Sequence, residues 1–259
     1  MAESPAGPPR LERGDDGRAT ITLNRPQHLN RLHREDLAAL QQHFADVAAD
    51  PSVRVLVLTG QGRAFCAGFN LDELNQADAA GSDPQAFERM VEALAAVPQP
   101  TVVRLNGGVY GGATDLALAC DFRLGVETLE LRMPAVRLGL HYYPSGLQRA
   151  VAKLGLQAAK RLFLLGQPMD AAALLQMGWL DGAVAADALD TAVDGLVAAL
   201  LAGAPLALLG MKRSLDEIAR GEFDLARLRA REAACAASAD LREGMAAMAA
   251  RRPPRFSGR

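Results

Sequence analysis

Cysteine, lysine and aromatic residues are all scarce in this chain of 259 residues. The three cysteines, Cys66, Cys120 and Cys235, form no C-x-x-C pair. Their number and spacing argue against a disulfide scaffold and a zinc ribbon, and they favour a reducing, cytoplasmic location. No run of about 18 apolar residues lacks a charge, so no transmembrane helix is expected. Residues 1–17 have no apolar stretch of the kind a secretory signal needs, and the sequence predicts a flexible tail there.

An excess of one charge is also missing. The 28 Lys and Arg residues nearly balance the 30 Asp and Glu residues, for a formal net charge of −2. Binding to nucleic acid through a basic surface is therefore not expected. Apolar residues make up 50% of the chain, which excludes intrinsic disorder over most of its length. His28, His33 and His43 have no metal-ligand spacing, so we expect no metal site and assign these side chains to the solvated surface.

Strand and helix patterns alternate along residues 18–200, which predicts an α/β fold built from βαβ units. Strands are expected at 19–23, 53–58, 101–105, 122–126 and 129–132, and helices at 34–49, 85–97 and 112–120. From Gly146 onward the pattern is almost entirely helical. Beyond a soft boundary near residue 200, residues 201–259 are expected to form a C-terminal helical region. Its apolar stripes, with Leu225, Leu228 and Cys235, predict a partner surface.

Two glycine-containing turns follow predicted strands. One is Phe65-Cys66-Ala67-Gly68-Phe69-Asn70, and the other lies at 106–115 with Gly107-Gly108 and Gly111-Gly112. Ligands of α/β folds bind at the carboxyl ends of strands, and glycine lets a ligand approach the backbone closely. A helix that begins near Gly112 presents free N–H groups, so donors from both turns can converge on one developing oxyanion. Either turn alone is better explained as an ordinary strand-to-helix connection, and the second matches no nucleotide-binding glycine motif.

Taken together, the ordered segments resemble the crotonase (enoyl-CoA hydratase/isomerase) superfamily from about residue 18 to 256. The segments are Leu23-Asn24-Arg25-Pro26, Val55-Leu56-Val57-Leu58-Thr59-Gly60, Phe65-Cys66-Ala67-Gly68, Asn106-Gly107 with Gly111-Gly112, Cys120-Asp121 and Asp240-Leu241-Arg242-Glu243-Gly244-Met245. The resemblance implies a spiral core of ββα turns over 18–200 and a helical trimerisation region over 201–259. It also implies an acyl-CoA substrate, no cofactor beyond the coenzyme A of that substrate, and a homotrimer or dimer of trimers without nucleic-acid or membrane partners.

Carried over position by position, the family's oxyanion hole corresponds to the backbone N–H groups of Phe69 and Gly112. Hydratases of the family use two glutamates. One corresponds to Asp115 and the other to Ala135, which cannot transfer a proton. His141 and Tyr143 lie in a segment that replaces the family's glycine- and proline-rich turn, and they are further acid/base candidates. Alternatively, the tyrosines at 142 and 143 simply fill an acyl pocket that Ala135 enlarges.

Further candidates for contact with the substrate lie around these turns. The resemblance implies that the CoA nucleotide is bound by Arg25, Gln27, His28 and Arg31. Arg251 and Arg252 are expected to help across a subunit boundary. Further substrate contacts are expected at Ala67, Asn70, Leu71, Gly111 and Ala135. Asn70 is expected to fix the first turn, and Cys66 is expected to serve packing only. The polar segment 72–85 is expected to be mobile without ligand.

Two classes of function follow from these residues. The first is an enzyme, a lyase or isomerase, that acts on an acyl-CoA thioester through a stabilised enolate with Asp115 as the leading proton carrier. The second is a catalytically weak acyl-CoA-binding member, which the alanine at position 135 motivates. Thioester hydrolysis and decarboxylation remain open because the same oxyanion hole serves them. A triad of Ser145, His141 and Asp115 is a weaker option, since the G-x-S-x-G elbow is absent.

Overall fold

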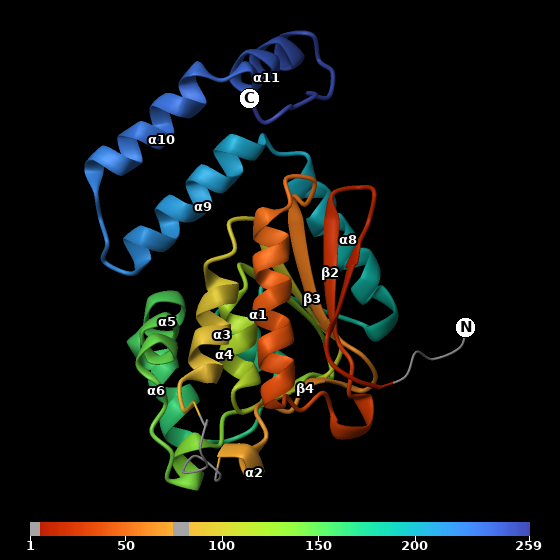
Figure 1. Cartoon of the computed structure of the whole chain (residues 1–259), viewed down its shortest axis with the longest axis vertical. Coiled ribbons are helices and arrows are strands. Elements are labelled where there is room, and N and C mark those ends of the chain that lie inside the picture. Colours follow the sequence, from red (N-terminus) through yellow and green to blue (C-terminus); the bar gives the residue numbers. More distant parts are fainter. Residues whose placement is uncertain (1–5, 75–82) are drawn as a thin grey trace.

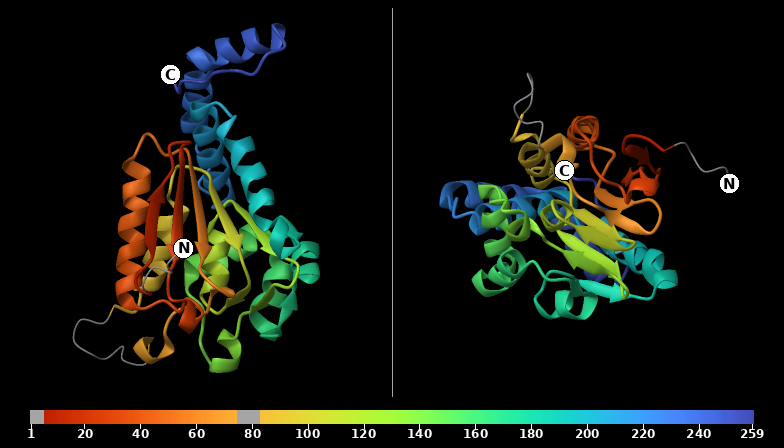
Figure 2. Two further views of the ribbon diagram at one scale, coloured as in Figure 1. Left: turned by 90° about the vertical axis from the view of Figure 1, so that its right-hand side faces the viewer. Right: turned by 90° about the horizontal axis from the view of Figure 1, so that it is seen from below.

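The computed structural model describes residues 6–74 and 83–259, which form two sheets surrounded by helices (Figures 1 and 2). In the larger sheet the strand order is β1-β2-β3-β5-β7-β10, and in the smaller it is β4-β6-β8-β9. The larger sheet comprises β1 (Arg10–Arg13), β2 (Arg18–Leu23), β3 (Val55–Gly60), β5 (Thr101–Leu105), β7 (Phe122–Val126) and β10 (Gly182–Val184). The smaller comprises β4 (Ala64–Cys66), β6 (Gly108–Tyr110), β8 (Glu130–Arg132) and β9 (Met169–Asp170).

From β3 to β8 consecutive strands alternate between the two sheets, and this alternation generates a spiral. The pair β3 and β4 precedes α3 (Ala86–Ala95), β5 and β6 precede α4 (Ala113–Ala119), and β7 and β8 precede α5 (Pro144–Leu154). From one ββα unit to the next, each sheet gains one parallel strand. The predicted α/β class and the crotonase-like spiral core are therefore confirmed.

Apolar side chains fill the space between the larger sheet and its helices. The run 55–58 in β3 is buried at every position, as expected for a parallel strand that is covered on both faces. On one side, α1 (Arg34–Ala49) buries Leu37, Leu40, Phe44 and Val47 at helical spacing. On the other side, α8 (Leu189–Leu201) packs against β3, β5 and β7 (Figure 1).

Shorter helices connect these elements and frame the site. They are η1 (Pro26–His28), α2 (Leu71–Leu74), η2 (Ala135–Leu138), α6 (Leu156–Leu165), α7 (Ala171–Gln176) and η3 (Ala186–Ala188). Among the described residues no single helix is long and apolar enough to cross a membrane. Only the bent pair 186–201 and 205–219 passes on length and composition, with an angle of 105° between its halves.

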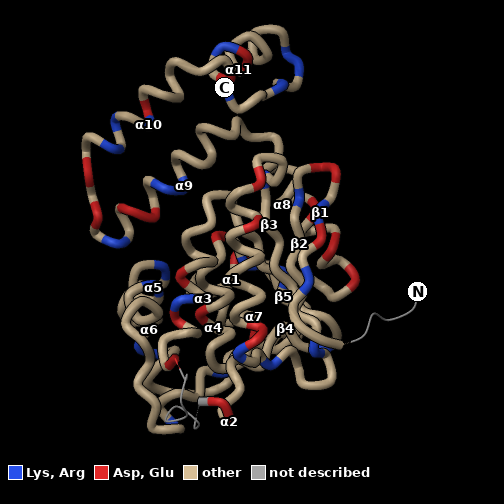
Figure 3. Tube along the Cα trace, viewed as in Figure 1, with Lys and Arg blue, Asp and Glu red and all other residues tan. Residues whose placement is uncertain are grey.

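Three C-terminal helices project from the end of the core: α9 (Pro205–Ala219), α10 (Leu225–Ala237) and α11 (Ala239–Ala249) (Figures 1 and 2). Lys212 anchors α9 to the core, since its Nζ lies 2.7 Å from a carboxylate oxygen of Asp121. Arg231 on α10 binds Glu217 on α9 at 2.7 Å. Acidic and basic residues gather at the bend between α9 and α10 (Figure 3).

Several predictions of secondary structure are wrong. Residues 10–13, assigned to a flexible tail over 1–17, form β1 and pair antiparallel with β2. The short strands β9 and β10 interrupt the region from Gly146 onward that was predicted to be almost entirely helical. Residues 108–110, predicted as part of a turn, form β6. The prediction of a mobile segment at 72–85 falls largely on residues 75–82, which lie outside the described residues.

Candidate active site

The two glycine-containing turns meet because they follow neighbouring parallel strands. β4 pairs with β6, so the turns at their carboxyl ends lie side by side. Gly68 has φ +83°, and a Cβ atom there would lie 2.7 Å from the carbonyl oxygen of Tyr110 and 3.0 Å from the nitrogen of Gly112. Only glycine combines this left-handed backbone with so close an approach.

Two backbone N–H groups at this junction have no acceptor among the described residues, namely those of Phe69 and Gly112. Several groups next to them in the two turns are bonded. The carbonyl of Gly68 accepts from Leu32 at 2.8 Å, and the N–H of Asn70 donates to the carbonyl of Leu32 at 2.9 Å. These bonds hold the turn in place and leave the two free donors beside each other, which is the arrangement that stabilises a developing oxyanion.

Asp115 lies one helical turn beyond Gly112 and is 1% exposed. Its Oδ1 accepts from Nε of Arg149 at 2.9 Å, and its Oδ2 accepts from the hydroxyl of Tyr143 at 2.7 Å. Arg149 also donates to Glu92 at 2.6 Å. Burial lowers the pKa of Arg149, but the Asp115 carboxylate outweighs it and the net pKa is raised. The residue predicted to carry the proton therefore sits in a buried ion pair.

An aromatic row connects the oxyanion turn to this ion pair. The ring centroids of Phe69 and Phe87 lie 6.1 Å apart, and those of Phe87 and Tyr143 lie 6.0 Å apart. Tyr142 and Tyr143 stack at 4.3 Å, and the Tyr142 hydroxyl donates to that of Tyr143 at 3.2 Å. Burial and the nearby Asp115 carboxylate raise the pKa of Tyr143 far above its ordinary value. Tyr143 thus stays a neutral phenol.

The other acid/base candidates have different surroundings. Ala135 is buried at the start of η2 and brings no polar group. His141 is exposed, and its Nδ1 contacts the carbonyl of Tyr142 at 2.8 Å. The hydroxyl of Ser145 donates to Glu88 at 2.7 Å. The Ser145–His141–Asp115 triad is therefore wrong, because each member is engaged with a different partner.

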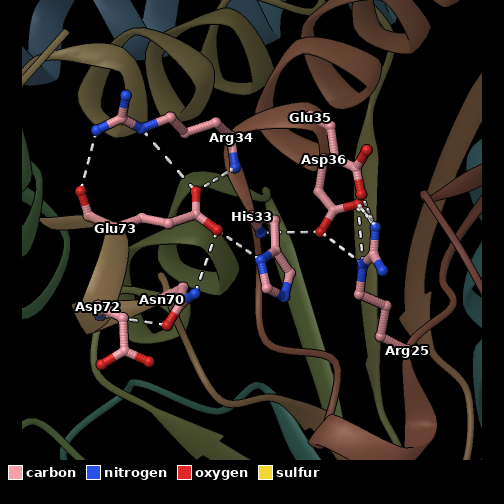
Figure 4. Close-up of polar contacts among 8 residues, drawn as sticks. All are labelled: Arg25, His33, Arg34, Glu35, Asp36, Asn70, Asp72 and Glu73. Atoms are coloured by element: carbon pink, nitrogen blue, oxygen red, sulfur yellow. Dashed lines mark hydrogen bonds and ion pairs between the residues drawn. The ribbon is translucent and has the colours of Figure 1, made fainter. Parts of the chain in front are cut away.

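A polar cluster fixes the chain just after Phe69 (Figure 4). Glu73 on α2 accepts from the N–H of Arg34 at 2.9 Å and from the side chain of Asn70 at 3.2 Å, and its Oε1 lies 2.5 Å from Nδ1 of His33. Asn70 Oδ1 also accepts from the N–H of Asp72. Asn70 thus holds the first turn as expected. His33 is half-buried in this cluster, so its assignment to the solvated surface is wrong.

The proposed CoA-wrapping residues are only partly available to a ligand. Arg25 forms ion pairs with Glu35 and with the buried Asp36, so its charge is already engaged within the chain (Figure 4). Gln27 and His28 are exposed. The Arg31 guanidinium has no partner among the described residues, and it remains the open cation of this group.

The remaining candidates divide between the site and the surface. Ala67 and Gly111 are partly exposed in the two turns, and Leu71 is 47% exposed at the start of α2. Arg252 pairs with Glu243 within the C-terminal region. His43 also departs from the predicted solvated surface, since it is half-buried with its Nε2 3.0 Å from the carbonyl of Pro9.

Cys66 serves packing. It is fully buried, and burial raises its pKa to about 12, so no thiolate forms near neutral pH. No group of three or more possible metal ligands occurs in the described part of the chain.

Comparison with known proteins decides the family. The enoyl-CoA hydratase/isomerase family model matches residues 13–259. The chain belongs to the enoyl-CoA hydratase/isomerase family. The chain is 31% identical to the 2,3-dehydroadipyl-CoA hydratase of Escherichia coli, with 92% of this chain and 94% of that protein covered. It is 32% identical to the 1,2-epoxyphenylacetyl-CoA isomerase of the same organism, with 96% and 98% covered.

The fold agrees with that assignment. The crystal structure of an enoyl-CoA hydratase from Bacillus anthracis superposes with a TM-score of 0.87 at 26% identity, covering 98% of this chain and all of that one. Membership of the enoyl-CoA hydratase/isomerase family confirms the crotonase resemblance found in the sequence.

Sequence reasoning missed the ion pair of Asp115 with Arg149, and it missed the carboxylates Glu92 and Glu88, which bind Arg149 and Ser145. These residues lie on helices other than that of Asp115, and no local motif marks them. The one available signal was the spacing of Ser145 and Arg149, which places both on the same face of a predicted helix. In the structure that face meets α3, where Glu88 and Glu92 have the same spacing.

Proposed function

We propose that this protein catalyses a reaction of an acyl-CoA thioester in which the N–H groups of Phe69 and Gly112 stabilise an enolate. The observation that carries the proposal is the pair of unbonded N–H groups at the junction of the two turns. A thioester carbonyl gains negative charge when its α-carbon is deprotonated or its β-carbon is attacked. Fixed donors in a buried site stabilise that charge without reorganisation. Coenzyme A enters as part of the substrate, and the open Arg31 is the cation we assign to its phosphates.

The reaction is that of a lyase or an isomerase. Relatives of nearly equal identity carry the names of a hydratase and of an isomerase, so similarity alone does not choose between them. Ala135 favours a reaction that does not need a second carboxylic acid. Hydration of 2-enoyl-CoA thioesters and double-bond shift of 3-enoyl-CoA thioesters, assayed side by side, separate the two.

The test compares Gly112→Pro with Gly112→Ala. Both add a Cβ atom, which would lie 2.6 Å from the ring of Phe87, but only proline removes the N–H. We expect proline to lower turnover by a further factor of about 10²–10³ relative to alanine. Equal turnover of the two variants would contradict the assigned oxyanion hole.

A catalytically weak acyl-CoA-binding protein is the second candidate, and the buried alanine at position 135 favours it. A panel of CoA thioesters distinguishes the two. Binding of the esters without turnover of any of them supports the second candidate and contradicts the first.

We also propose a homotrimer or dimer of trimers in a reducing compartment. The reducing compartment is supported by the three cysteines, which are all free. The assembly is supported by exposed apolar side chains such as Leu215, Phe223 and Met245, which lie in the projecting C-terminal region.

A further inference from the structure

The Asp115 carboxylate is buried, and both of its oxygens already accept hydrogen bonds from protein groups. Arg149 occupies Oδ1, and Tyr143 occupies Oδ2, while the side chain as a whole is 1% exposed. Tyr143, by contrast, is only half-buried and borders the aromatic row that begins at the oxyanion turn. The group that can meet a bound acyl chain here is therefore the phenol and not the carboxylate.

The ion pair also fixes the direction of the hydrogen-bond chain. A carboxylate held beside Arg149 can only accept, so Tyr143 must donate its single proton to Asp115. Tyr142 donates to the Tyr143 oxygen at 3.2 Å. A phenolic oxygen has two lone pairs, so one lone pair of Tyr143 remains for a further donor. A water molecule is the donor that fits an acyl-CoA site of this kind.

We propose that Tyr143 is the catalytic residue that contacts the water added to a 2-enoyl-CoA thioester, and that Asp115 and Arg149 are its positioning residues. This inference rests on the proposed function. In the forward step one O–H bond of water breaks and its proton passes to the Tyr143 oxygen, while the original Tyr143 proton passes to Asp115. The hydroxide oxygen bonds to the β-carbon, and the C=C electron pair moves through the α-carbon to the thioester oxygen at Phe69 and Gly112.

The return step uses the same relay. The proton on Asp115 moves back to Tyr143, whose own proton bonds to the α-carbon as the enolate electron pair forms the C–H bond. One water has then been added, and both residues regain their starting protonation. The one relay of Tyr143 and Asp115 performs both halves, which accounts for an alanine where a second acid would otherwise stand. Because the Asp115 carboxylate that receives the proton is already paired with Arg149, the relay predicts slow hydration.

The test uses full-length Tyr143→Phe, Asp115→Asn and the double variant, assayed for hydration of 2-enoyl-CoA and for affinity of the saturated acyl-CoA. We expect each single variant to lower kcat by a factor of about 10²–10⁴ with ester affinity unchanged. The double variant should lose no more than the worse single variant, because the two residues act as one unit. Tyr142→Phe is the matched variant, since it removes a hydroxyl from the same stacked pair but leaves the Tyr143–Asp115 bond. We expect it to lose about tenfold at most.

Each contrary outcome has a distinct meaning. A wild-type protein that turns over acyl-CoA thioesters while Tyr143→Phe keeps kcat within about threefold overturns the inference alone. A Tyr143→Phe variant that changes affinity but not kcat overturns it as well, since that pattern marks a packing role. Additive losses in the double variant overturn the relay. If the wild-type protein isomerises thioesters but never hydrates them, the inference is overturned and the proposed function stands. If the wild-type protein turns over no thioester at all, both are overturned. Tyr143→Phe decides the question even if Asp115→Asn fails to fold.

Discussion

At the scale of single residues, position 135 has the clearest chemical consequence. Ala135 is 5% exposed at the start of η2, and the crotonase resemblance assigns a proton-transferring glutamate to this position. We predict that Ala135→Glu raises hydration of crotonyl-CoA, by up to about 10²-fold, since a positioned acid or base typically contributes 10²–10⁴-fold. Ala135→Gln is the control, because it has nearly the same size and cannot transfer a proton. Equal rates for the two variants would show that the new carboxyl group does not reach the reacting carbon.

Two glycines with positive φ in the oxyanion turns allow backbone strain to be tested separately from steric clash. Gly68 has φ +83° and no room for a Cβ atom, while Gly111 has φ +56° and open space around it. We predict that Gly111→Ala costs about 1 kcal/mol of stability and keeps most of the turnover. Gly68→Ala should in addition push apart the two turns and lower turnover at least about tenfold. Thermal unfolding and kcat measured on both variants check this, and similar kcat values would count against the close approach.

The predictable part of the site was its backbone. Glycine marks the two turns, because other residues cannot occupy such positions, and the crotonase resemblance then assigned the two N–H groups to Phe69 and Gly112. The ion pair and hydrogen bond of Asp115 could not be predicted from the sequence. Its role depends on Arg149 and Tyr143, and that contact is created by the packing of α5 on α4 and not by any local pattern.

At the scale of elements, the Glu73 cluster ties α2 to the start of α1 directly after the oxyanion turn. Burial raises the pKa of Glu73, but hydrogen bonds from Arg34, His33 and Asn70 outweigh burial, and the pKa lies below its ordinary value. A depressed pKa means that the carboxylate stabilises the fold above its unfolded-state pKa of about 4.3 and loses that contribution as the pH falls through the folded value.

We predict that Glu73→Gln lowers the free energy of unfolding by about 0.5–1.5 kcal/mol at neutral pH. The difference from wild type should stay constant above about pH 5 and shrink below about pH 4. Glu35→Gln is the control, since Glu35 is 64% exposed in its pair with Arg25 and should change stability by less than about 0.5 kcal/mol. Denaturant titrations from acid to neutral pH provide the measurement. A difference that grows on acidification would refute the assigned direction of the shift.

Helices and strands were predicted correctly where the segment was long enough to show a recurring pattern of apolar residues. Helix α1 and strand β5 lie where the sequence places them, because apolar residues recur at helical spacing in the first and form a dense β-branched run in the second. Strands β9 and β10 have two and three residues. Such segments hold less than two periods of alternation, and they are strands only because β8 and β7 are there to pair with them. β1 was missed for a similar reason. It is a strand because it pairs with β2, although the proline and charged residues around it argue against one.

At the scale of the whole molecule, the C-terminal helices leave an apolar surface without cover. They project from the core instead of folding against it (Figures 1 and 2). Leu215 and Met245 are each 66% exposed, Phe223 is 62% exposed and Met248 is 81% exposed. A group of exposed apolar side chains of this kind usually marks an interface between proteins. The ion pairs at the α9–α10 bend do not supply the missing stability, since exposed pairs contribute roughly 0–1 kcal/mol each.

We therefore predict that the protein sediments as a trimer or a dimer of trimers at micromolar concentration. Replacing Leu215 and Met245 together by serine should shift the population toward monomer, because each loses apolar area that the partner would bury, at about 25 cal/mol per Å². Leu164→Ser on α6 is the comparison, since Leu164 is 61% exposed on the core and not on the projecting helices. A stable wild-type monomer would contradict the assembly outright. Dissociation caused by Leu164→Ser, with the Leu215 and Met245 variant still assembled, would move the interface from the C-terminal helices to the core surface around α6.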